Sequence, residues 1–176
     1  MLDYTKEELL SLIENTPEQF NEWKKDKEDV DLSEVDFSNM ILKDVDFSDV
    51  DLNSSSFSDG NLSLVNFSGA DLTAVDFTRA VVTECDFSES ILTGADCSYA
   101  EMTYCNFTDC DMAGTVLSET VLTSSDLSAA ENLNSARYDS DTVWPDDEML
   151  PEGFDGAYKD DLSSLKDDED STIGDY

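Results

Sequence analysis

Few side chains in this sequence have the types and spacing that catalysis or metal binding requires. The 176 residues include no histidine, which removes the commonest general base and metal ligand. The four cysteines show no C-x-x-C spacing of the kind that indicates a zinc or redox motif; they are Cys85, Cys97, Cys105 and Cys110. A nucleophile with a histidine base is therefore excluded.

Carboxylates are the one reactive group present in excess. A pair of them in unequal environments can act as general acid and base, and the segments 139–141 and 146–148 are acidic enough to suggest calcium. Neither segment has the glycine-centred spacing of a calcium loop. Because the acidic residues recur evenly along the chain, we expect them on convex faces, outside any cleft. We therefore expect no enzymatic activity, no metal site and no cofactor.

The net charge limits the partners of this protein. Against 43 acidic residues stand 9 basic ones, a formal charge of −34, which excludes direct binding to nucleic acid or to an anionic membrane. The charge is compatible with a partner protein that is basic or that itself binds polyanions. No apolar stretch approaches the ~18 residues of a membrane span, and the N-terminus does not resemble a signal peptide. Together with four cysteines that show no C-x-x-C spacing, these features predict a reduced, cytoplasmic setting.

A five-residue repeat dominates the sequence. From Val30 to Ala129 the chain reads as 20 consecutive quintets without insertion or deletion. The first position is small or aliphatic, the second is usually Asp or Asn, the third is large and apolar, and the fourth is mostly Ser or Thr. This period fits neither a helix nor a strand. It indicates a chain that turns a corner every five residues, so that four corners close a 20-residue coil and stacked coils lie ~4.8 Å apart.

Phenylalanine provides an internal test of the four-sided coil. At ten-residue intervals the third position is phenylalanine, except at Cys97: Phe37, Phe47, Phe57, Phe67, Phe77, Phe87 and Phe107. A square coil places these rings in two columns on opposite faces, with Leu-type columns between them. A coil of three or five sides would mix the columns, so the pattern predicts a square.

The quintet pattern (A/V/C)-(D/N)-(L/F)-(S/T)-x resembles the pentapeptide-repeat family over residues 30–129. The segments 20–24 (FNEWK) and 138–145 (YDSDTVWP) are similar to the leader and closing segments of members from photosynthetic bacteria. The resemblance implies an all-β solenoid, the right-handed quadrilateral β-helix, here with about five 20-residue coils. It also implies a candidate activity, because some members imitate duplex DNA and occupy the DNA-binding saddle of type II topoisomerases such as gyrase.

Four segments follow from the repeat and its flanks. We expect an N-terminal α-helical cap over residues 1–29, the β-helix over 30–129, a closing segment over 130–155 and a flexible acidic tail over 156–176. A capping box at Thr5 and a proline at the first helical position after Thr16 predict two short helices. Beyond Ala129 the register slips, which predicts an irregular final turn with Trp144 covering the core.

Each side of the square has its own outward residues. Face one begins at Val30, face two at Val35, face three at Met40 and face four at Val45, and each recurs every twenty residues. Face four has a net charge of −6 and no basic residue, which makes it the candidate DNA-mimicking surface. Its acidic residues are Asp46, Asp49, Asp86, Glu89, Asp109 and Asp126.

Face three is the least charged side, with a net charge of −2. Its outward positions form an apolar row, and two further apolar residues are expected near an adjoining corner. An exposed apolar row is typical of an interface, although scattered surface hydrophobes are also common. The candidate interface residues are Ile41, Leu64, Val81, Tyr99, Tyr104, Val116 and Val121.

Two functions are consistent with these surfaces. The first is a non-catalytic interaction or scaffold protein with an unidentified protein partner or a second copy of itself. The alternative is a DNA mimic that binds a DNA-binding protein such as gyrase.

Overall fold

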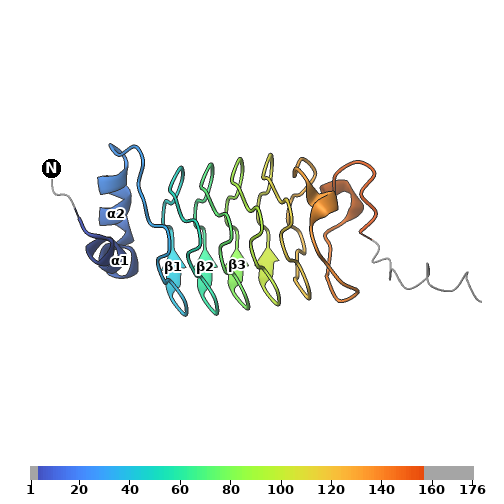
Figure 1. Ribbon diagram of the computed structural model, residues 1–176, viewed down its shortest axis with the longest axis horizontal. Helices are drawn as coiled ribbons and strands as arrows, with labels where there is room; N and C mark the ends of the chain where they lie inside the picture. The colour runs from blue at the N-terminus through green and yellow to red at the C-terminus, as the bar shows by residue number, and fades with distance from the viewer. Residues whose placement is uncertain (1–3, 157–176) are drawn as a thin grey trace, which may run out of the picture.

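Residues 4–156 are described by a computed structural model, in which the chain forms an elongated rod with two helices at one end (Figure 1). Stacked coils fill the length of the rod, and the first four repeat coils each add one short strand to a parallel sheet. The elements in chain order are α1 (Lys6–Asn15), α2 (Pro17–Lys24), β1 (Ile41–Lys43), β2 (Asn61–Ser63), β3 (Val81–Thr83), β4 (Glu101–Thr103), and the 3-10 turns η1 (Leu133–Ser135) and η2 (Asp147–Met149).

Successive coils pair in parallel with a shift of twenty residues. Strands β1 to β4 on face three are in register, with Leu42 opposite Leu62, and the other three faces pair at the same interval, as Asp31 does with Asp51. The chain is thus the right-handed quadrilateral β-helix that the repeat predicted. None of the helices among the described residues is long and apolar enough to cross a membrane.

Two phenylalanine columns form the centre of the rod. Phe37, Phe57 and Phe77 stack on face two with ring centroids 4.7 and 5.2 Å apart. The column from Phe47 to Phe107 on face four has spacings of 5.5, 4.9 and 5.0 Å. The two columns meet edge to face at interplanar angles between 65° and 84°. The sequence prediction of two opposite columns is confirmed, and each ring adds about 1.5–3 kcal/mol of burial.

The backbone amides explain the polar half of the quintet. In the quintet 50–54, four backbone amides donate to backbone carbonyls at 2.9–3.2 Å. The first amide closes a turn and the second donates to the preceding coil. The third and the fifth amides donate to the following coil. The fourth amide, of Asn53, has no backbone acceptor and donates to the side chain of Asp51 at 3.0 Å. The second-position carboxylate therefore completes the hydrogen bonding of its own quintet.

This side-chain hydrogen bond recurs throughout the described repeats. Twelve second-position residues accept from the amide two residues later at 2.8–3.0 Å: Asp31, Asp36, Asp46, Asp51, Asn66, Asp71, Asp76, Asp86, Asp96, Asn106, Asp111 and Asp126. Where the fourth residue is serine, its hydroxyl can donate as well, and hydrogen bonds from the Ser38 hydroxyl and amide lower the pKa of Asp36. About half of the repeat region's carboxylates thus take part in the hydrogen bonding of the turns.

The fifth position forms the corner. Every fifth-position residue from Glu34 to Ser124 has a positive φ, between 55° and 67°. Only glycine adopts this left-handed region without a steric cost, and β-branched residues are the least tolerated there. No Val, Ile or Thr occupies the position anywhere in the repeats, a signal that the sequence analysis missed.

The N-terminal cap replaces the missing coil. Helices α1 and α2 cover the first coil with Leu9, Ile13 and Phe20 buried, and the predicted capping box of α1 is present. The carboxamide of Asn21 imitates a neighbouring strand: it donates to the Asp44 carbonyl at 2.8 Å and accepts from the Asp46 amide at 2.9 Å.

A lysine also holds the cap in place. Lys6 Nζ lies 2.8 Å from Asp31 Oδ1 and 2.8 Å from the carbonyl of Ser33. The hydrogen bond from Lys6, with those from Ser33, lowers the pKa of Asp31 to about 2. The α1 helix is thereby attached to the exposed edge of the first coil, an edge that would otherwise pair with other chains.

The C-terminal end differs from the expected irregular turn. Arg137 pairs with Val116 and Val143 with Val121, and the amide of Leu127 donates to the Met149 carbonyl at 2.8 Å. Residues 131–149 thus form three sides of a sixth coil, with about six residues per side, and reach face four at Met149. Trp144 packs against Tyr138 and Phe154 at its end. Residues 157–176 of the expected acidic tail lie outside the described residues.

The corner conformation leads to a stability prediction. Ala74 is exposed and has φ of 55°, so Ala74→Gly should stabilise the protein by about 0.5–1 kcal/mol, because relief of the left-handed conformation outweighs the added chain entropy. Ala113→Gly is the control at a position without positive φ and should destabilise by a similar amount. Urea unfolding measures both; a loss of stability in Ala74→Gly would contradict the corner assignment.

Candidate interaction surfaces

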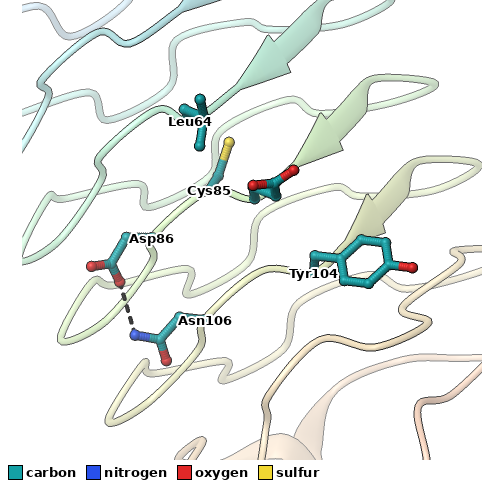
Figure 2. Close-up of a pocket in the computed structure, with 6 residues that line it drawn as sticks. Leu64, Cys85, Asp86, Tyr104 and Asn106 are labelled. Carbon is teal, nitrogen blue, oxygen red and sulfur yellow. Dashed lines mark hydrogen bonds between the residues drawn. The ribbon is translucent and has the colours of Figure 1, made fainter.

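The described surface offers open hollows without a catalytic constellation. Figure 2 shows the hollow at the corner of faces three and four, lined by Leu64, Glu84, Cys85, Asp86, Tyr104 and Asn106. Within residues 4–156, no group of three or more His, Cys, Asp or Glu side chains is placed to hold a metal ion. This includes the two acidic segments, 139–141 and 146–148, that the sequence analysis considered for calcium. Interaction surfaces are therefore the sites to consider.

Face three carries an apolar stripe, with one apolar outward side chain in each repeat coil. Ile41 is 79% exposed, Leu64 46%, Val81 38% and Tyr104 64%, and the half-buried Val121 completes it. The stripe alternates between the second and fifth positions from one coil to the next, so its members form a zigzag along the rod.

Two predicted interface residues lie outside the apolar stripe. Tyr99 is 55% exposed at the corner between faces two and three, and Val116 is half-buried on face two, in the column of Asp96. Val143, exposed in the sixth coil, extends the stripe beyond Val121, its bridge partner. The sequence analysis missed Val143 because it did not predict a sixth coil.

Backbone pairing explains why face three can be apolar. Its fourth-position residues belong to strands in register, Lys43 with Ser63 and Ser63 with Thr83. For Ser63 and Thr83, pairing with the preceding strand takes the place of a second-position side chain as acceptor. Ile41 and Val81 can therefore stand where the other faces mostly have Asp or Asn.

Face four differs from the expected row of stacked carboxylates. Its second-position column alternates Asp and Asn, and the amides of Asn66 and Asn106 donate to Asp46 Oδ1 and Asp86 Oδ1 at 3.2 and 3.1 Å; the latter bond is drawn in Figure 2. The alternation separates the carboxylates and neutralises part of their repulsion. Each of these aspartates, Asp126 included, also completes a turn.

The other three acidic residues of face four have a different setting. Asp49, Glu89 and Asp109 are exposed at the left-handed corners. By contrast, Asp46 is partly covered by the cap, with Lys24 Nζ 3.7 Å from its Oδ1. The fifth-position residues are therefore the part of the acidic face that a partner can contact freely.

Sequence comparison agrees with this architecture. A model of the pentapeptide repeat region matches residues 28–96, and a model of eight pentapeptide repeats matches residues 100–136, together more than half of the chain. The chain belongs to the pentapeptide-repeat family. No curated protein matches this pentapeptide-repeat chain significantly over its sequence.

Solved structures of pentapeptide-repeat proteins are similar to parts of this chain. The pentapeptide-repeat protein Rfr23 from the cyanobacterium Cyanothece 51142 is 20% identical, over 65% of this chain and 90% of that chain, with a TM-score of 0.37. A trypsin-treated form of QnrB1, a plasmid-mediated fluoroquinolone resistance protein, is 18% identical over 64% of this chain and 59% of its own, also with a TM-score of 0.37. A pentapeptide-repeat protein from the thylakoid lumen of Arabidopsis thaliana is 31% identical over 57% and 63%, with a TM-score of 0.27.

The Asp–Asn column leads to a prediction about charge. Asn106→Asp removes the donor to Asp86 and places a carboxylate ~4.8 Å from its neighbours in both adjacent coils, so it should destabilise the fold by about 1–2 kcal/mol in low salt. Asn61→Asp is the control, because its column neighbours Ile41 and Val81 are uncharged. Chemical unfolding should show the Asn106→Asp deficit shrinking at roughly 0.5 M salt. Equal, salt-independent effects of the two variants would contradict this account.

Proposed function

We propose that this pentapeptide-repeat protein has no catalytic activity and acts by binding another protein along its outer surface. The observation that carries the proposal is the apolar stripe on the least charged face. Burial of each exposed aliphatic or aromatic side chain contributes about 1.5–3 kcal/mol, so the stripe can form the core of an interface. Its polar neighbours, such as Lys43, Asn61 and Glu101, suit an interface rim.

Two single substitutions test the apolar stripe. Val81 and Ile91 are both second-position residues, 38% and 42% exposed, on faces three and one respectively. Val81→Asp, alone or with Tyr104→Asp, should abolish association with a second copy or with a partner, because it buries a charge at the interface. Ile91→Asp should leave association intact. Sedimentation velocity of the purified protein measures association with a second copy. The same measurement after capture of partners from source cells measures association with another protein.

The outcome that refutes the proposal is equally specific. If the Val81→Asp/Tyr104→Asp variant sediments as the unaltered protein does and retains the same partners, the stripe is not a binding surface. Equal losses in Val81→Asp and Ile91→Asp would show a general effect of added charge.

A second candidate, DNA mimicry, is favoured by the density of charge. The repeat region carries 19 acidic and 2 basic side chains, a net of −17 over five coils, or ~24 Å at the strand spacing. This is one charge per ~1.4 Å of rod, against ~1.7 Å of axis in duplex DNA. The family resemblance points to the DNA-binding saddle of a type II topoisomerase such as gyrase as the partner surface.

A supercoiling assay with gyrase separates the two candidates. A DNA mimic should inhibit supercoiling, and the triple variant Asp49→Asn/Glu89→Gln/Asp109→Asn should lose this inhibition, because it removes the corner charges of face four while leaving every turn-forming aspartate in place. The matched control removes three corner charges from other faces: Glu34→Gln/Glu84→Gln/Glu119→Gln. Absence of inhibition, or equal loss in both variants, would refute mimicry by face four.

A further inference from the structure

The positions of the apolar stripe are symmetric about its middle coil. Its members stand at the second position in the first, third and fifth repeat coils, and at the fifth position in the second and fourth coils. Figure 2 shows Leu64 and Tyr104 on the two coils that flank the coil of Cys85. Val81 lies in that middle coil and is therefore the centre of the stripe. In order along the rod, the members are Ile41, Leu64, Val81, Tyr104 and Val121.

A row that is symmetric about its centre can pack against a second copy of itself. A two-fold axis brings the same surface patch of both chains together. For two rods that lie side by side with face three against face three, this axis runs either along the rods or along the strands. The two cases give each residue of the face a different neighbour, so the sequence distinguishes between them.

An axis along the rods places apolar residues against polar ones. It sets each coil against the same coil of the second copy and exchanges the second position with the fifth. Ile41 would then face Asp44, and Val81 would face Glu84. The other three members would also face polar side chains, those of Asn61, Glu101 and Ser124. Because a carboxylate buried against an apolar side chain loses its hydration without gaining a partner, this parallel arrangement is disfavoured.

An axis along the strands places apolar residues against apolar ones. It passes through Val81 in β3, exchanges the first coil with the fifth and the second with the fourth, and keeps second positions opposite second positions. Val81 then faces Val81 of the second copy. Ile41 faces Val121, and Leu64 faces Tyr104. Each member of the stripe is therefore covered by another member.

We propose that the chain forms an antiparallel homodimer through face three, with the two-fold axis at Val81. The inference rests on the proposed function of the stripe as a binding surface, and it identifies the bound protein as a second copy of the chain. Each chain has a net charge of −34, so two copies approach most readily through their least charged side. That side is face three, with a net charge of −2 against −6 on face four.

The acidic side chains of face three also suit the antiparallel arrangement. Glu101 faces Asn61, whose side-chain amide can donate a hydrogen bond to it. Asp44 faces Ser124, whose hydroxyl can do the same. Glu84 is the exception, because it lies in the middle coil and faces Glu84 of the second copy. This contact between like charges weakens the dimer.

The area of the face predicts a reversible dimer. Five coils span ~24 Å and a side of five residues spans ~16 Å. The face therefore measures roughly 400 Å², and the dimer buries about twice that area, below the 1,200–2,000 Å² of stable complexes. The dimer should form at high protein concentration and dissociate on dilution.

Cysteine cross-linking of the full chain tests the arrangement. Val81→Cys should form a covalent dimer under mild oxidation, because the two introduced thiols face each other at the axis. Ile41→Cys and Val121→Cys should not cross-link when either is present alone, since the equivalent residues of the two copies then lie four coils, ~19 Å, apart. A mixture of these two variants should cross-link, because Ile41 faces Val121.

Two controls and a second measurement accompany the cross-linking. Ile91→Cys is the matched control, at the same quintet position on face one and similarly exposed. The unaltered chain, whose four cysteines are buried, controls for the native thiols. In sedimentation equilibrium, Glu84→Gln should tighten the dimer about fivefold in low salt by removing the like-charge contact, whereas Glu89→Gln on face four should not.

The outcomes separate this dimer from the proposed function. Absence of a covalent dimer in Val81→Cys, or cross-linking of Ile91→Cys or of Ile41→Cys alone to the same extent, would overturn the antiparallel arrangement. A chain that stays monomeric at its highest soluble concentration would overturn it as well. If another protein is captured by the unaltered chain and lost in Val81→Asp, the stripe remains a binding surface and only the dimer is refuted.

Discussion

The amide of the fourth residue in each quintet is the group on which the rest of the surface depends. On the faces without strands, four of the five amides find backbone acceptors and the fourth has none, as residues 50–54 show. The second position of the same quintet supplies the acceptor, as Asp51 does for Asn53. Of the twelve quintets in which this bond forms, ten use aspartate and two use the neutral Asn66 and Asn106. The fold thus requires an acceptor, and the predominance of aspartate in that role makes the rod acidic.

The same requirement explains where the rod is not acidic. On face three, strand pairing replaces the side-chain acceptor, which leaves Ile41 and Val81 free to be apolar, and β-branched residues suit strands in any case. Leu64 and Tyr104 have no such explanation. They occupy left-handed corners, where glycine or asparagine costs less, and they are 46% and 64% exposed. Their presence is the part of the apolar stripe that the fold does not account for, and it favours a binding role.

Much of this architecture could be predicted from the sequence, because the period is uninterrupted and Phe37 and Phe57 must stack if coils have twenty residues. The sixth coil could not, since its spacing changes to six residues at Arg137 and Val143 and no longer matches the repeat. The left-handed corners were visible only as an absence of β-branched residues. The alternation of Asp46 with Asn66 is present in the sequence, but its meaning depends on knowing that these side chains lie within hydrogen-bonding distance.

The division of acidic residues between structure and surface constrains any model of recognition. Asp46, Asp86 and Asp126 stand about 9.6 Å apart, two coils each, and each is engaged by its own turn. Face one instead places Asp31, Asp51 and Asp71 in adjacent coils, so the densest row of charge is not on the most acidic face. A partner that recognises the charge along this rod must contact carboxylates that make no hydrogen bond within the fold. On face four those are the fifth-position residues Asp49, Glu89 and Asp109, which are exposed and whose corner amides donate to backbone carbonyls. On face two, by contrast, the fifth-position Asp59 is paired with Arg79 at 2.7 Å.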